Sequence, residues 1–414
     1  MSSDSCPQTE VLNKSALRYR AVRKAVVAVT VVIALASIGY WAVNISKHRE
    51  FEHECKSASE AKDWDKLRDA ADRWVCWSPT SAKGWWYAAE AAQELEDFED
   101  LADCLGKVPE SDLKAILAYA EKANLEWTVL NRPLEALRTS EHVLDIDPRV
   151  LEIHSRVISY YAMTMQREQL LKSIRRAIAA GAEPKETYTS LMMADFLAFQ
   201  NGDTINSHWL AASPNEVRFK IGLAIQTAVK VTMNQESRRT EESVQLNKEA
   251  SQQLEWFLEN QPGDPVLLAY MLHRAYLAGD LEGTAKLLLQ VDDRSINDHM
   301  IWVYRAWYHT MMDEFEDAEE SIHEAIRQHP MSPLAHHEYA NLLRRLQRPE
   351  VADEQRIAAY GKQLRADIMR IDSAANLTPE LLLRIHSYAE ACGDLHGHAH
   401  SNSHATRVCF VRVM

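Results

Sequence analysis

The chain has 414 residues, of which 46% are hydrophobic and 26% charged, and its formal net charge at pH 7 is −14. With 12 Gly, 13 Pro and 6 Cys it has an ordinary globular composition, which argues against collagen, wholesale disorder and a dense disulfide scaffold. The acidic balance argues against nucleic-acid binding, which needs a concentrated basic face. The remaining choice is between two or three compact domains and one repeat array, and the low glycine content favours helices in either case.

The N-terminal part consists of a basic segment, 1–24, followed by an uncharged apolar segment, 25–45. As a helix, the apolar segment is long enough to cross roughly 30 Å of hydrocarbon. Tyr40 and Trp41 lie near its far end, where aromatic rings favour the membrane interface. We therefore predict a single transmembrane helix that anchors the protein in a membrane. The alternative is a cleavable signal peptide, because residues 34–36 read Ala-Leu-Ala, a cleavage-site pattern.

The orientation of this helix follows from the flanking charges. Five Lys or Arg residues lie in the twenty positions before the segment and four in the twenty after it. The positive-inside rule then favours a cytoplasmic N-terminus and an extracytoplasmic remainder by a small difference. In an oxidising compartment, a disulfide among Cys55, Cys76 and Cys104 is an alternative to buried free thiols.

A 34-residue spacing runs through the C-terminal half of the chain. Three evenly spaced units begin at Pro265, His299 and Pro333, and each has a turn sequence near its middle. In the unit from His299, small residues let two antiparallel helices approach, large apolar residues fill the space between them, and a proline ends the second helix. These residues are, in that order, Ala306 and Ala318, then Trp302, Phe315 and Ile322, then Pro330.

The same register returns upstream, where Asp63-Trp64 and Asp97-Phe98 are again 34 residues apart. We predict about eight helix pairs within 46–362, strongest in 265–362, including a unit near Lys185 with a short second helix and a pair formed by 215–233 and 241–260. Segment 363–392 is expected to form capping helices, one of them started by an N-cap at Thr378. The polar tail, 393–414, is expected to be flexible and His-rich.

These positions resemble the tetratricopeptide repeat (TPR) family, with this chain as an N-terminally membrane-anchored member. The resemblance implies an all-α fold: a TPR-type α-solenoid of antiparallel helix pairs preceded by a single transmembrane helix. In such arrays the first helix of each pair lines a concave groove that binds a peptide or a partner protein. The resemblance therefore implies a protein–protein interaction scaffold or assembly factor that binds partner segments in that groove.

Enzymatic activity and a cofactor are not expected. The sequence has no phosphate-binding loop, dinucleotide-binding fingerprint, nucleophile elbow or zincin motif. The acidic run 313–320 is most simply a solvated face around a turn and a helix start, where carboxylates favour the helix dipole.

The candidate partner-binding residues occupy the groove-facing positions of the family's register and form an aromatic floor that leads into a basic rim. They are Trp86, Tyr87, Tyr270, His273, Tyr304, Trp307, His337, Asn341, Arg344 and Arg345. For each aromatic residue the competing interpretation is packing between helices. The carboxylate-clamp positions of chaperone-binding TPR domains hold Ala269 and His273, then Val303 and Trp307, which argues against chaperone C-terminal tails as the partner.

Two other functions stay open from the sequence. One is a metal-handling protein, because His396, His398, His400 and His404 in the tail could chelate Ni, Cu or Zn through neutral imidazoles. The other is a structural envelope protein that works by self-association of the array.

Overall fold

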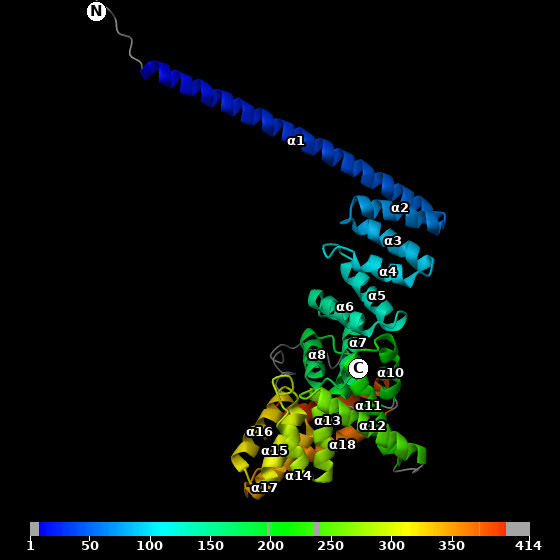
Figure 1. Cartoon of the computed structure of the whole chain (residues 1–414), viewed down its shortest axis with the longest axis vertical. Helices are drawn as coiled ribbons and strands as arrows, with labels where there is room; N and C mark the ends of the chain where they lie inside the picture. The colour runs from blue at the N-terminus through cyan, green and yellow to red at the C-terminus, as the bar shows by residue number, and fades with distance from the viewer. Residues whose placement is uncertain (1–7, 197–198, 200, 236–240, 372, 395–414) are drawn as a thin grey trace, which may run out of the picture. The chain divides into compact units, whose positions relative to one another are not determined.

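The computed structural model describes residues 8–196, 199, 201–235, 241–371 and 373–394. Throughout these residues every regular element is a helix, so the predicted all-α fold is confirmed. The chain divides into two compact units, 1–118 and 119–414, and each is described by itself (Figure 1).

The first unit contains four helices and the beginning of a fifth: α1 (Gln8–Glu60), α2 (Trp64–Trp77), α3 (Ala82–Glu94), α4 (Phe98–Gly106) and α5 (Ala115–Thr128). Each of α1, α2 and α3 packs against the helix that follows it along the chain. This successive packing is the arrangement of a TPR-like helical array.

The second unit continues with α6 (Pro133–Ile146), α7 (Leu151–Met163), α8 (Arg167–Ala180), α9 (Lys185–Met192), α10 (Gly202–Ala212), α11 (Val217–Gln235), α12 (Glu241–Asn260), α13 (Pro265–Ala278), α14 (Leu281–Leu288), α15 (His299–Met311), α16 (Phe315–Gln328), α17 (Pro333–Arg345), α18 (Val351–Ile368), the 3₁₀ turn η1 (Ala374–Asn376) and α19 (Pro379–Ala391). Helices α13, α15 and α17 begin at the three residues from which the 34-residue spacing was counted.

Helix starts are fixed by side-chain caps. Asp63 and Asp97 each accept a hydrogen bond from the third backbone N–H beyond them, at 3.3 and 3.2 Å. Asp264, Ser332 and Thr378 do the same, and each is followed by a proline at the first helical position. Such a cap satisfies an N–H that the helix leaves open, and the proline has no N–H to lose there.

The turn between the two helices of a repeat holds a residue with left-handed backbone. In the last three repeats these residues are Gly279, Asp313 and Gln347, with φ of 67°, 60° and 53°. In the first unit Lys62 and Glu96 occupy the same place, with φ of 55° and 57°. The 34-residue period is therefore visible in the backbone itself, although only one of these five turns uses glycine, the residue for which such a φ has no steric penalty.

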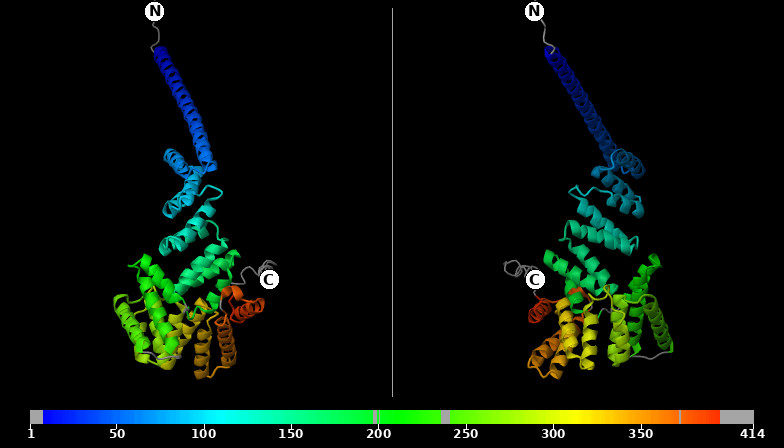
Figure 2. Two further views of the ribbon diagram at one scale, coloured as in Figure 1. Left: turned by 90° about the vertical axis from the view of Figure 1, so that its right-hand side faces the viewer. Right: turned by 60° about the vertical axis from the view of Figure 1, so that its left-hand side comes forward.

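Helices α15 and α16 pack as the repeat pattern predicts. Ala306, Ala318, Ile322 and Ala325 are at most 2% exposed and belong to one apolar cluster with residues of α13 and α17. The small side chains let the two helix backbones approach, while Ile322 fills the space between them. Both views in Figure 2 show the helices of this part of the chain (yellow to orange) side by side.

Helix α1 changes character along its length. Its apolar residues from Val29 to Val43 are exposed, and this part of the helix is long and apolar enough to cross a membrane. A membrane span and a signal sequence both have these properties. Farther along, His48 and Phe51 pack on Trp74 of α2, and His48 Nδ1 accepts a hydrogen bond from the Trp74 indole at 2.9 Å. One unbroken helix thus carries both the apolar segment and the first packed turns of the array.

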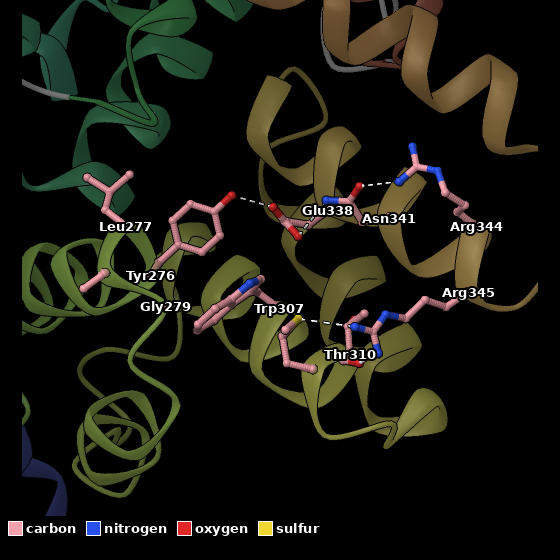
Figure 3. A pocket seen from close by; sticks show the side chains of 11 residues that line it. Tyr276, Leu277, Gly279, Trp307, Thr310, Glu338, Asn341, Arg344 and Arg345 are labelled. Carbon is pink, nitrogen blue, oxygen red and sulfur yellow. Dashed lines mark hydrogen bonds between the residues drawn. The ribbon is translucent and has the colours of Figure 1, made fainter.

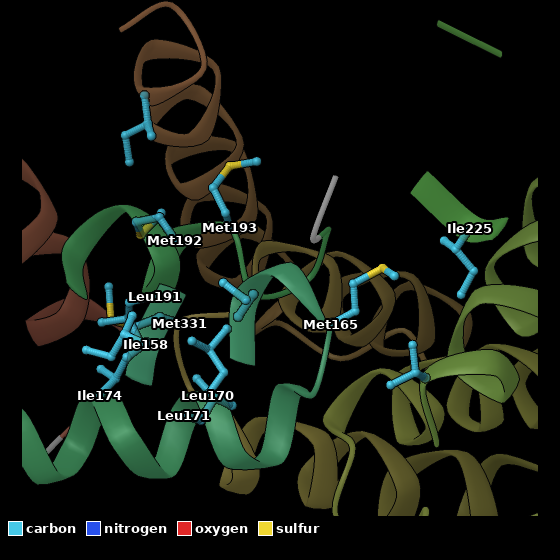
Figure 4. Packing of buried hydrophobic residues seen from close by; sticks show 14 of the residues in the cluster. Ile158, Met165, Leu170, Leu171, Ile174, Leu191, Met192, Met193, Ile225 and Met331 are labelled. Carbon is cyan, nitrogen blue, oxygen red and sulfur yellow. The ribbon is translucent and has the colours of Figure 1, made fainter. Parts of the chain in front are cut away.

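A feature that the sequence did not predict is the core of the second unit. Ile158, Leu170 and Met192, from α7 to α9, belong to one buried cluster (Figure 4). The cluster also contains residues more than a hundred positions later in the chain, including Leu364 of α18 and Ile385 of α19. Helix α9 packs against α18 and η1. The second unit therefore closes on itself, and α19, expected only as a cap on the last repeat, also contributes to this shared core.

Candidate functional site

A groove of about 770 Å³ lies across three consecutive first helices, α13, α15 and α17. These helices are neighbours because each repeat stacks its first helix on that of the next. The groove is lined by Tyr276, Leu277, Ala278, Gly279, Trp307, Thr310, Met311, Glu338, Asn341, Arg344 and Arg345 (Figure 3). Four of the ten residues predicted for partner binding are among them: Trp307, Asn341, Arg344 and Arg345.

The floor of this groove is aromatic. The rings of Tyr276 and Trp307 meet edge to face, with centroids 5.2 Å apart. Next to them, the side chains of Leu277 and Met311 are 70% and 41% exposed. An exposed apolar surface of this kind, rimmed by polar groups, is the usual form of a binding site for an apolar side chain.

Behind the floor lie three predicted residues that the structure places elsewhere. Tyr304 is only 1% exposed and pairs with His273, whose Nδ1 lies 2.8 Å from the tyrosine hydroxyl. Tyr270 is half-buried against the large shared core. The prediction that Tyr304 contacts a partner directly is therefore corrected: the ring supports Tyr276 from beneath, with centroids 5.6 Å apart. Burial lowers the pKa of His273 to about 4, which keeps its imidazole neutral at pH 7.

A chain of hydrogen bonds connects the floor to the rim. The Tyr276 hydroxyl donates to Glu338 at 2.7 Å, and the Asn341 amide donates to the same carboxylate at 3.2 Å. Asn341 in turn accepts a hydrogen bond from Arg344 at 2.9 Å. Burial and the carboxylate together raise the pKa of the Tyr276 hydroxyl, so it remains a donor. These bonds hold the four side chains in one arrangement.

Glu338 is the residue that the sequence reasoning missed. It is only 4% exposed, and its side chain organises the groove from below. The signal was present, since Glu338 is the sixth residue of its unit, a groove-facing position in the register that selected Asn341. A buried carboxylate requires hydrogen-bond partners, and the groove supplies them.

The two arginines at the rim differ in their partners. Arg345 pairs with Asp313 at 2.7 Å and also donates to the Thr310 carbonyl. Arg344 is exposed, and within the described residues it makes no ion pair, its bond to Asn341 being to a neutral group. His337 is exposed nearby but does not line the groove. The rim therefore presents one positive charge that no carboxylate of the described chain neutralises.

The other two predicted residues, Trp86 and Tyr87, lie in the first unit. Both are half-buried, and the Tyr87 ring packs 6.2 Å from that of Trp74. The neighbouring Trp85 donates its indole N–H to the Pro79 carbonyl and has Lys107 Nζ 5.0 Å from its ring centroid. These contacts are those of packed aromatic residues. The tail histidines proposed as metal ligands lie outside the described residues.

No protein-family model and no curated protein matches the chain. Solved structures similar to the chain include those of TPR-repeat proteins. The APC/C hetero-tetramer Cut9-Hcn1 shows 12% identity over 88% of this chain and 82% of that chain, with a TM-score of 0.30.

Two further solved structures have similar sequence identities and TM-scores. Yeast Tom70 shows 12% identity over 84% of each chain, with a TM-score of 0.26. The structure of Naa15/Naa10 bound to HypK-THB shows 13% identity over 88% of this chain and 63% of that chain, with a TM-score of 0.28.

Proposed function

We propose that this protein is a membrane-anchored, TPR-like scaffold or assembly factor that binds a segment of a partner protein in the groove across α13, α15 and α17. The observation that carries the proposal is the groove itself, which combines a half-buried aromatic floor beside exposed Leu277 and Met311 with an arginine that lacks a carboxylate partner among the described residues. Aromatic residues and arginine are the residue types that contribute most to protein–protein affinity.

The chemistry of the groove indicates what it accepts. Trp307, Tyr276 and Met311 offer a surface for one large apolar side chain. Arg344, held in place by Asn341, offers a charge-assisted hydrogen bond to a carboxylate. A partner segment that places Asp or Glu close to a large apolar residue would satisfy both.

The membrane part of the proposal rests on α1. Its exposed apolar residues have no packing partner among the described residues of the first unit, with Val32, Leu35 and Trp41 at 64%, 64% and 66% exposure. A lipid environment would cover them. We place the N-terminus on the cytoplasmic side and the repeats outside, as the flanking charges favour. Anchoring would raise the effective concentration of the groove for partners in the same membrane.

The test uses the full-length protein in lipid nanodiscs and a display library of random short peptides. We expect enrichment of peptides with Asp or Glu near a large apolar residue. Trp307→Ala and Arg344→Glu should each weaken binding of the enriched peptides about tenfold or more, since truncating such an anchor costs about 2 kcal/mol.

Matched controls lie outside the groove. Trp256→Ala removes an exposed tryptophan of α12, and Arg356→Glu reverses an exposed arginine of α18. Both should leave peptide binding unchanged. Failure to enrich any peptide class, or equal losses in the groove and control variants, would refute the assignment of this groove.

A further inference from the structure

A second site lies in the interior of the second unit and shares no residue with the groove lining. Asp195 follows α9, His299 begins α15, and His329 ends α16. The closure of the second unit brings these distant residues together, and they are 6%, 0% and 1% exposed. The carboxylate and the two imidazoles offer one ligand atom each, and these three atoms all lie within 4.8 Å of one another.

The hydrogen bonds around these three residues leave several of their nitrogen atoms without a partner in the described chain. Asp195 Oδ1 lies 2.9 Å from His299 Nε2, while Oδ2 accepts from the Leu334 backbone N–H at 3.3 Å and lies 3.6 Å from Arg365. The remaining nitrogen of His299 and both nitrogens of His329 are buried and have no hydrogen-bond partner among the described residues. The His299 and His329 rings meet edge to face at 4.8 Å.

Three unpartnered nitrogens at one place are unfavourable, because each buried polar atom without a partner costs about 1–3 kcal/mol. A further histidine, His336, shows the contrast. Its two nitrogens lie 2.6 Å from Glu354 and 2.7 Å from the Pro330 carbonyl, so it has no free lone pair to offer. Burial lowers the pKa of His336, but hydrogen bonds to Cys392 and Glu354 outweigh that effect and raise it to about 10.

We propose that Asp195, His299 and His329 bind a divalent transition-metal ion, Zn²⁺ in the first place. Two imidazoles and one carboxylate form a ligand set that Zn²⁺ accepts, whereas Mg²⁺ and Ca²⁺ prefer oxygen ligands alone. His329 supplies a lone pair from a nitrogen that has no hydrogen-bond partner among the described residues, and His299 Nε2 would exchange its hydrogen bond to Asp195 Oδ1 for a bond to the ion. Arg365 and the Leu334 N–H orient the carboxylate through Oδ2, which leaves Oδ1 toward the histidines, as outer partners of metal ligands commonly do.

The geometry requires only local adjustment. Ligand atoms around tetrahedral Zn²⁺ are about 3.3 Å apart, because each lies about 2.0–2.1 Å from the metal. Rotation of the two imidazoles about their side-chain bonds closes the remaining gap of up to about 1.5 Å. A water molecule would complete the four-coordinate shell. Because the three side chains are at most 6% exposed and leave no access for a substrate, we assign the ion a structural role. It ties the segment after α9 to the repeats that begin at His299 and Pro333.

The experiment uses full-length protein purified without an affinity tag. Its background carries Asn in place of the tail histidines His396, His398, His400 and His404, so that these cannot bind metal. Zinc content is measured by mass spectrometry after dialysis. The chain is then stripped with a chelator and titrated with Co²⁺, whose visible spectrum reports tetrahedral coordination. Three variants follow in the same background: His329→Gln, His329→Cys and the control His154→Gln.

His154 is a suitable control because it is also fully buried in the second unit and also has an unpartnered nitrogen, yet it belongs to no such cluster. We expect about one Zn²⁺ ion per chain in the background protein and in His154→Gln, and none in His329→Gln. His329→Cys should retain Co²⁺ and add a thiolate charge-transfer band, which shows that position 329 is a ligand even where His329→Gln fails to fold. Absence of saturable Zn²⁺ and Co²⁺ binding in the background protein would overturn the proposal, as would an unchanged Co²⁺ spectrum in both His329 variants.

Discussion

The ion pair between Arg167 and Asp298 allows a direct test of how α8 is held against the start of α15. The charged groups lie 3.2 Å apart, and the two side chains are 9% and 3% exposed. Asp298→Asn keeps the side-chain shape and the cap bond to the Met300 N–H but removes the negative charge. Loss of one partner of a buried ion pair costs about 3–5 kcal/mol, because the other charge stays buried without compensation. Arg167 retains a 3.0 Å hydrogen bond to the Ala194 carbonyl, so we expect Asp298→Asn to lower the stability by about 3 kcal/mol, the low end of that range.

A matched variant separates the charge from the helix cap. Asp264 caps α13 through a 2.9 Å bond to the Leu267 N–H, and it forms no ion pair within the described part of the chain. Because Asn and Asp cap helices about equally well, Asp264→Asn should change stability by less than about 1 kcal/mol. The double variant Arg167→Met, Asp298→Asn should recover part of the loss, since it leaves no unpaired charge.

Hydrogen exchange followed by mass spectrometry is the assay, because it reports opening of α8 and α15 separately from the rest of the chain. Asp298→Asn should speed exchange in both helices, because it lowers the free energy of their opening by about 3 kcal/mol. Equal effects of Asp298→Asn and Asp264→Asn, or a change in α15 alone, would refute the reasoning that this pair joins the two helices.

Three more predictions concern other parts of the chain. The raised pKa of His336, about 10, contributes stability that is fully present below pH of about 6.5 and is lost as pH rises toward 10. The urea midpoint of unfolding should therefore fall over this pH range, and His336→Gln should flatten the dependence of the midpoint on pH. A maleimide should label the exposed Cys76 quickly but leave Cys55 and Cys104 unlabelled until the chain unfolds, because all three are free and burial raises the pKa of the latter two to about 12. Deletion of residues 1–45 should move the protein from the carbonate-resistant membrane fraction to the supernatant, whereas retention in the membrane would contradict anchoring by α1.

The repeats could be predicted from the sequence because their stabilising contacts are local. The spacing of Ala306, Ala318 and Ile322 predicts which side chains face each other across one helix pair, and all three are buried. The same register placed Trp307 and Asn341 at the groove, because neighbouring repeats stack their first helices in the same way.

Contacts between distant repeats leave no such signal. The pairing of Asp195 with His299 crosses 104 positions, and no period links the two residues. Tyr270 was assigned to the groove by its place in the repeat, but it packs against the core that closure of the second unit creates. Tyr304 is instead buried within the cluster shared by α13, α15 and α17. For the same reason, the role of α19 in the shared core was not predictable from its sequence.

Under our proposal, a partner segment occupies the groove across α13, α15 and α17. The most direct measurement places a photo-reactive amino acid at position 311, in the groove, and for comparison at position 256, a more exposed site outside it. After irradiation of native membranes, we expect a cross-link from position 311 to a segment with an acidic residue beside a large apolar one. This cross-link should be lost in Arg344→Glu and absent from position 256. The same products at both positions, or a cross-link at 311 that Arg344→Glu leaves unchanged, would contradict the proposal.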